Sequence, residues 1–216
     1  MDIKTLIEHP HVWQGLRTHS TGAVYATGFK ELDAHLPGGG WPAAALTEII
    51  LEDHGIGELS LLMPAMARLC RRDVGKHACG WIFWVSPPFI PYAPALSKHG
   101  IDLNRVLLVH AAATQYGSLW AVEQALRAGS CVAVLAWAQF AGQTALRRLQ
   151  LAAERARCWT VLFRSGTALR QRSPAALRLR LRKLGEVTRV EILKCRGGRP
   201  GVVQIRHDDA GNPECS

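Results

Sequence analysis

Apolar runs of strand length alternate with amphipathic helical runs along most of this chain, and this alternation limits the possible folds more than any other feature. The strand-like runs lie at 46–51, 79–85, 105–110, 131–137 and 158–164. Helical periodicity lies between them, at 58–72, 92–99, 116–129 and 142–157. Such alternation predicts an α/β fold with a mostly parallel central sheet and helices on both of its faces.

The sequence that follows changes to a period-two pattern. Segments 176–184, 188–195 and 201–206 are separated by turn residues, and the first of them reads ALRLRLRKL. Alternating apolar and polar residues are typical of antiparallel strands that have one face in water. We therefore expect antiparallel strands at the C-terminal edge of the sheet.

The length of 216 residues is that of one domain. The patterns divide the chain into an N-terminal helix and arm at 1–26, a core domain at 27–207 and a flexible tail at 208–216. At the start of the core, Pro37 and the glycines at 38–40 predict a turn between a short helix and the first strand.

Composition points to a globular cytoplasmic protein. The chain is 48% hydrophobic and 20% charged, with no apolar run long enough to span a membrane and no secretory signal pattern at its start. The cysteines at 70, 79, 131, 158, 195 and 215 form no C-x-x-C motif, so we expect reduced core thiols. The histidines show no ligand spacing, and we expect no metal and no cofactor.

Positive charge is concentrated near the C-terminus. The net charge of the chain is +9, and residues 164–206 carry 12 Lys and Arg against 2 Asp and Glu. A basic segment of this kind favours an acidic partner, either nucleic acid or an acidic protein surface.

A loop that resembles a phosphate-binding loop follows the first strand, but its chemistry differs. On the template GxxxxGK[ST], Glu52 and Gly57 hold the glycine positions, Glu58 holds the lysine position and Leu59 holds the hydroxyl position. A like-charge contact with a phosphate at about 4 Å costs roughly 4 kcal/mol near a protein surface. We therefore expect that this loop does not bind ATP.

Other roles for the loop residues Asp53, His54, Gly55, Gly57 and Glu58 remain open from the sequence. The loop is either a relic turn or a protein contact, and the N–H groups of the following helix could bind an anion weakly. Glu58 is also explained as an ordinary first-turn residue of that helix, where a carboxylate suits the helix dipole.

Residues 20–207 resemble the RecA-like core. The resemblance rests on Thr27-Gly28, Leu32-Asp33, the Gly-Gly-x-Pro turn at 39–42 and Thr47-Glu48-Ile49, and on the segments 81–110 and 122–137. Where RecA has its catalytic Glu this chain has Ser86-Pro87-Pro88, and where the Walker B strand ends in Asp it has Ala136-Trp137. The resemblance therefore implies the fold and not the ATPase, and we expect no enzymatic activity.

Within that superfamily the chain resembles the ImuA/SulA-type proteins of bacterial SOS operons, in HVWQGLR at 11–17 and in segments 55–69 and 84–96. The ImuA type implies a cytoplasmic accessory factor of error-prone translesion synthesis, near the nucleoid after DNA damage. Its implied partners are an ImuB-like inactive Y-family polymerase homologue, RecA and a DnaE-type polymerase. The SulA type implies instead a division inhibitor that binds FtsZ.

Two surfaces are candidates for partner contacts. The first is a basic face that could contact DNA or an acidic partner, although a solvated strand face that protects a sheet edge explains the same pattern. It comprises Arg178, Arg180, Arg182, Lys183, Lys194, Arg196 and Arg199. The second is an apolar patch of Trp13, Phe89 and Tyr92, where the proline-rich segment 85–94 is either a stiff crossover or a docking loop. The N-terminal arm could dock on its own core, on a partner or on a second copy.

Overall fold

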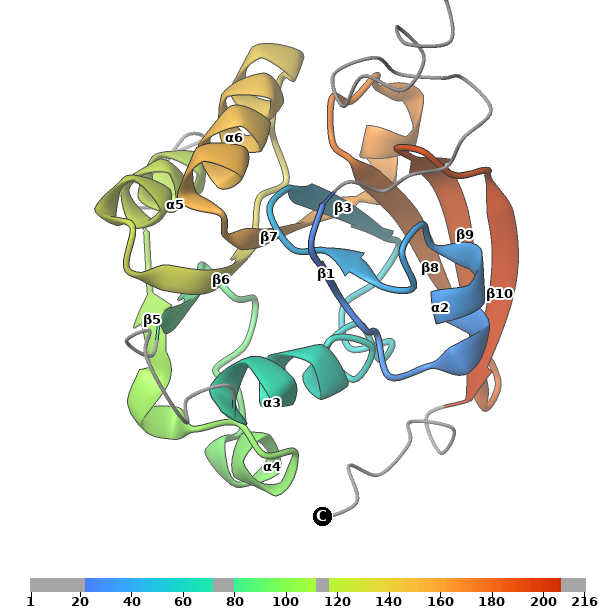
Figure 1. The fold of residues 1–216 in the computed structure, drawn as a ribbon, viewed down its shortest axis with the longest axis horizontal. Helices are drawn as coiled ribbons and strands as arrows, with labels where there is room; N and C mark the ends of the chain where they lie inside the picture. The colour runs from blue at the N-terminus through green and yellow to red at the C-terminus, as the bar shows by residue number, and fades with distance from the viewer. Residues whose placement is uncertain (1–21, 72–79, 112–116, 207–216) are drawn as a thin grey trace, which may run out of the picture.

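The fold is built on one eight-stranded sheet, seen in a computed structural model that describes residues 22–71, 80–111 and 117–206 (Figure 1). The strand order is β10-β9-β8-β3-β7-β6-β4-β5, and every pairing from β8 to β5 is parallel. The pairings of β8 with β9 and of β9 with β10 are antiparallel. The strands are β3 (Leu46–Leu51), β4 (Trp81–Val85), β5 (Val106–Val109), β6 (Cys131–Trp137), β7 (Trp159–Ser165), β8 (Leu177–Leu184), β9 (Val187–Cys195) and β10 (Gly201–Arg206).

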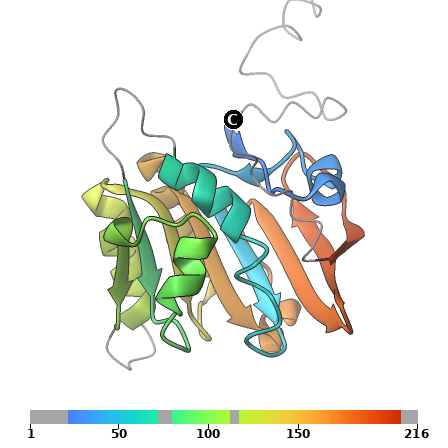
Figure 2. The ribbon, with the colours of Figure 1, turned by 90° about the horizontal axis from the view of Figure 1, so that it is seen from below.

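Helices cover both faces of this sheet. On one face lie α5 (Gly117–Ala128) and α6 (Gln143–Ala156), which contact each other and pack on a core that includes Leu46 and Leu162. The other face carries α2 (Lys30–His35), α3 (Met63–Arg71) and α4 (Ala93–Lys98). Figure 2 shows α3 and α4 in front of the sheet. Two short 3-10 helices, η1 (Leu103–Arg105) and η2 (Gly166–Arg170), and a small β1 (Val24–Tyr25) and β2 (Trp41–Pro42) sheet complete the described elements.

The fold class predicted from the sequence is confirmed, including the antiparallel strands at one edge of the sheet. The strand predictions agree closely with the observed strands because fully buried strands read as continuous apolar runs. Gly129 ends α5 in a left-handed conformation, at φ +68°, as a C-terminal glycine should. Of the predicted N-terminal helix and arm at 1–26, residues 1–21 lie outside the described residues, and residues 22–26 include β1. The predicted tail at 208–216 also lies outside the described residues.

The helix after the phosphate-loop segment begins later than predicted. The sequence suggested a start at residue 58, whereas α3 begins at Met63 and residues 58–62 form turns. Pro64 gives the physical reason, because proline fits the first turn of a helix but removes a hydrogen bond from its interior. The interpretation of Glu58 as a first-turn helix residue is therefore wrong.

The cysteines described here are free, as expected. Cys131 and Cys158 are buried, and Cys70 and Cys195 are partly buried without a disulfide. Burial raises the pKa of the Cys195 thiol to about 11, so this group is thiol rather than thiolate at neutral pH. Among the described helices, none has the length and hydropathy needed to cross a bilayer.

Candidate functional site at the carboxyl ends of the strands

The loop after β3 holds a carboxylate of its own. Gly55 and Gly57 adopt left-handed conformations, at φ +80° and +99°, and this curls the loop back on itself. The N–H of Gly55 donates a hydrogen bond of 2.9 Å to Oε1 of Glu58, whose residue is only 5% exposed. An anion from outside would meet this buried carboxylate, so the local chemistry opposes phosphate binding.

The first residue of the loop is fixed by cations from β8. Glu52 accepts a hydrogen bond from Arg180, and Nη2 of Arg182 lies 3.4 Å from the same carboxylate oxygen. The hydrogen bond from Arg180 lowers the pKa of Glu52, and the charges of both arginines act in the same direction. The next residues, Asp53 and His54, are exposed. The loop is thus attached to the sheet by Glu52 and closed by Glu58.

A row of aromatic side chains crosses three neighbouring strands close to this loop. Trp84 of β4 lies against Trp137 of β6 with ring centroids 5.8 Å apart, and Trp137 stacks on Phe163 of β7 at 4.6 Å. All three side chains are buried. Trp137 stands at the end of β6, where the resemblance to RecA would place a metal-orienting Asp. An indole there has no oxygen to offer a metal ion.

A pocket of about 320 Å³ lies between the loop and the aromatic row. Its walls come from the segments that follow β3 and β4 and from the end of β6. The carboxyl ends of parallel strands are where sheets of this kind place their binding sites. The lining residues are Gly55, Gly57, Glu58, Leu59, Ser60, Trp84, Pro87, Pro88, Phe89, Ile90, Pro91 and Trp137.

The proline-rich crossover presents an exposed apolar patch, which comprises Phe89, Ile90 and Tyr92. These side chains are 71%, 79% and 73% exposed. The predicted exposure of Phe89 and Tyr92 is confirmed, and their role in partner binding stays a prediction. Ile90 was not predicted from the sequence, although it lies between them in the same segment. Trp13, the third member of the predicted patch, lies outside the described residues.

The arginines of β8 differ from one another in their surroundings. Arg178 is buried and donates a hydrogen bond to the carbonyl of Ala168, with Nε 3.2 Å from Oε2 of Glu48. Arg180 is held between Glu52 and Glu191, while Arg182 is more exposed. Since β8 lies between β3 and β9, the interpretation of this stripe as edge protection is wrong. Arg178 belongs to the interior and not to an open basic face.

The remaining predicted cations are on the surface. Lys194 donates to the carbonyl of Ser173 at 2.8 Å, and Arg196 pairs with Glu154 at 2.9 Å. Lys183 and Arg199 are exposed, at the far end of β8 and in the turn after β9. The structure therefore spreads these cations along two strands, and a role in contacting DNA or an acidic partner stays a prediction.

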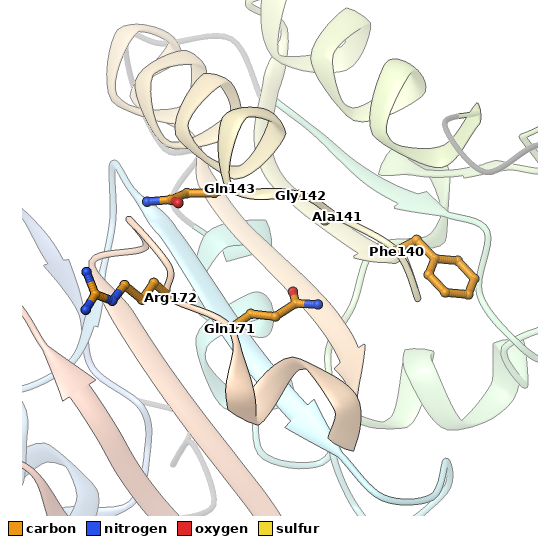
Figure 3. A pocket seen from close by; sticks show the side chains of 6 residues that line it. All are labelled: Phe140, Ala141, Gly142, Gln143, Gln171 and Arg172. Atoms are coloured by element: carbon orange, nitrogen blue, oxygen red, sulfur yellow. The ribbon is translucent and has the colours of Figure 1, made fainter.

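A second hollow, of about 460 Å³, opens beside the start of α6 (Figure 3). Its walls are residues 140–143 and the pair Gln171 and Arg172, whose side chains point in opposite directions. Buried Arg164 links the two walls, because its Nη2 donates to the carbonyl of Ala141 at 2.9 Å and to Oε1 of Gln171 at 2.8 Å. Among the residues that the structure describes, no acid, thiol or hydroxyl side chain lines this hollow.

Sequence reasoning missed an exposed aromatic pair on the other face of the sheet. Trp120 of α5 and Phe140, which follows β6, are 64% and 61% exposed and line one groove between α5 and α6. Helical periodicity could have predicted the exposure of Trp120, because Leu119 and Val122 point into the core and Trp120 does not share their face. In the described part of the chain, no cluster of His, Cys, Asp or Glu suits a metal ion.

Comparison with known proteins places these features in context. No protein-family model matches the sequence. The chain is 29% identical to Protein ImuA of Caulobacter vibrioides strain NA1000 / CB15N over 219 aligned positions. That alignment covers 90% of this chain and 88% of the relative, and Protein ImuA of a second strain, ATCC 19089 / CIP 103742 / CB 15, gives the same values. This similarity supports an ImuA-like protein.

Proposed function

We propose that this protein is a non-catalytic accessory factor of damage-induced translesion DNA synthesis, acting as an adaptor between other proteins. The observation that carries the proposal is the similarity to Protein ImuA along nine-tenths of the chain. Its partners would be an ImuB-like inactive Y-family polymerase homologue, RecA and a DnaE-type polymerase. The exposed crossover patch of Phe89, Ile90 and Tyr92 supports a docking role, because a proline-rich loop loses little entropy on binding.

The chemistry of the loop supports the absence of an ATPase. Glu58 fills the loop with negative charge, and Trp137 stands where a metal-orienting carboxylate would be needed. The segment after β4 supplies prolines at positions 87 and 88 instead of a carboxylate base. Each of these replacements removes a different group that phosphoryl transfer requires.

We expect that magnesium and ATP leave the thermal stability of the protein unchanged. A ligand present at a hundred times its Kd would stabilise the folded state by about 2.7 kcal/mol, and this shifts Tm by several degrees for a chain of this size. Differential scanning fluorimetry with and without Mg·ATP measures the effect. A clear rise in Tm, or ATP hydrolysis that falls in a Glu58→Ala variant, would contradict the proposal.

The adaptor role is tested by affinity purification of the tagged protein from DNA-damaged cells of its own host, followed by mass spectrometry. We expect recovery of the ImuB-like protein, RecA or the DnaE-type polymerase. A variant with Phe89→Ser, Ile90→Ser and Tyr92→Ser should lose recovery if the crossover patch is the docking surface. Leu151→Ser on α6, also exposed, serves as the matched control. Recovery of FtsZ in place of these proteins would indicate a division inhibitor.

A further inference from the structure

The pocket between the loop after β3 and the aromatic row contains a buried carboxylate that is incompletely paired. Glu58 uses Oε1 to accept the Gly55 N–H, while Oε2 is buried and has no hydrogen-bond partner among the described residues. A carboxylate accepts up to about four hydrogen bonds, and leaving a buried polar atom without one costs about 1–3 kcal/mol or more. Oε2 of Glu58 can therefore accept a hydrogen bond from a ligand, and the negative charge of the carboxylate favours a positively charged donor.

Two further polar groups of the pocket residues are also unpaired. Nε1 of Trp84 and Nε1 of Trp137 are buried and have no acceptor in the described part of the chain. Both residues line the same pocket as Glu58. Aromatic faces attract cations, and an arginine guanidinium stacks on them especially well. The residues that line the pocket thus carry one unpaired acceptor, two unpaired N–H donors and aromatic rings.

The charge of the loop selects the kind of ligand. Asp53 adds an exposed carboxylate in the same loop, whereas the charge of Glu52 is already compensated by Arg180 and Arg182. Nucleotides and nucleic acids carry phosphates, which this arrangement repels. The volume of about 320 Å³ lies at the small end of ligand sites, which suits one long side chain. The exposed Phe89 and Ile90 at the rim suit apolar neighbours of that side chain.

We propose that this pocket binds an arginine side chain of a partner protein, with the guanidinium on Glu58 and along the aromatic row. A phosphate-binding loop binds an anion after the first strand of its sheet, whereas this pocket would bind a cation. The inference does not rest on translesion synthesis as the function, because it follows from the pocket alone. The partner segment would present the arginine between apolar residues, and its carbonyl groups would accept from the indole N–H donors.

The test uses a small arginine probe and its neutral isostere. Nα-acetyl-L-arginine methylamide is titrated into the isotopically labelled full-length protein, and the assigned indole N–H signals of Trp84 and Trp137 are followed by NMR. Nα-acetyl-L-citrulline methylamide has nearly the same shape and no charge. We expect saturable shifts of both indole signals with the arginine probe and an affinity at least about tenfold weaker for the citrulline probe.

Matched variants separate the pocket from general charge effects. Glu58→Gln keeps an acceptor for the Gly55 N–H and removes the charge, so the arginine probe should bind about tenfold more weakly or not at all. Glu186→Gln alters an exposed carboxylate in the turn after β8 and should leave binding unchanged. The same spectra report whether each variant is folded. Equal binding of both probes, unchanged binding to folded Glu58→Gln, or no saturable shift at millimolar probe would overturn the proposal.

Discussion

Replacing Glu48 by alanine is expected to lower the free energy of unfolding by about 3–5 kcal/mol. Glu48 is fully buried on β3, and its Oε1 accepts a hydrogen bond of 2.8 Å from Nη1 of Arg164 on β7. Arg178 on β8 approaches Oε2 at 3.2 Å as an ion pair, without the alignment of a hydrogen bond. The substitution would leave two buried guanidinium groups without their counter-charge, and this unpaired charge makes the loss large.

Urea unfolding followed by circular dichroism measures this loss. Glu48→Gln keeps a hydrogen-bond acceptor and should lose less stability than Glu48→Ala. Glu186→Ala, in the exposed turn between β8 and β9, should stay within about 0.5 kcal/mol of the parent. If Glu48→Ala lost less than about 1 kcal/mol, the two arginines would have to find other compensation, and the network would not hold the three strands together.

Gly40→Ala is expected to destabilise the protein by about 3 kcal/mol, at the upper end of overpacking costs. A Cβ at Gly40 would lie 2.2 Å from the carbonyl oxygen of Tyr25 and 2.9 Å from the nitrogen of Ala26. These atoms belong to the backbone and cannot move aside as a flexible side chain would. Relief would require β1 to separate from β2, and this would disturb the contacts of Tyr25 and Trp41 with Trp159.

Gly22→Ala provides the matched control, since a Cβ there meets no atom of the described residues within 4 Å and the backbone is not left-handed. Its stability should match that of the parent within about 0.5 kcal/mol. Thermal unfolding monitored by circular dichroism compares the two variants directly. A Gly40→Ala protein that melted at the parental temperature would show that β1 does not pass as close to Gly40 as described.

The candidate site was only partly predictable from the sequence. The mismatch with a phosphate-binding loop could be recognised because the template is local, and Glu58 stands where that template requires lysine. The hydrogen bond between Glu58 and Gly55 could not be predicted, because it depends on a helix that begins at Met63 and leaves residues 58–62 to form turns. Pro64 indicates a helix that begins close to residue 63. The amphipathic pattern extends back to residue 58, and the helix was therefore predicted to begin there.

The contacts within the aromatic row also could not be predicted from the sequence. Trp84 and Trp137 lie in two of the apolar runs that the sequence predicted as strands, and both side chains are buried. That Trp84 and Trp137 meet each other depends on β4 and β6 being neighbours in the sheet. No pattern within either strand specifies this neighbour, so the sequence did not predict the pocket that they line.

The sequence alone determined where most strands and helices lie, because burial imposes a period of two or of 3.6 on residues that are close in the chain. Only the tertiary structure decided which charges meet. Glu48 and Arg164 are 116 residues apart in sequence, and Glu52 and Arg180 are 128 apart. They pair because β3 lies between β7 and β8 in the sheet. The periodic pattern of β8 predicted a basic face, and the strand order turned part of that face into internal ion pairs.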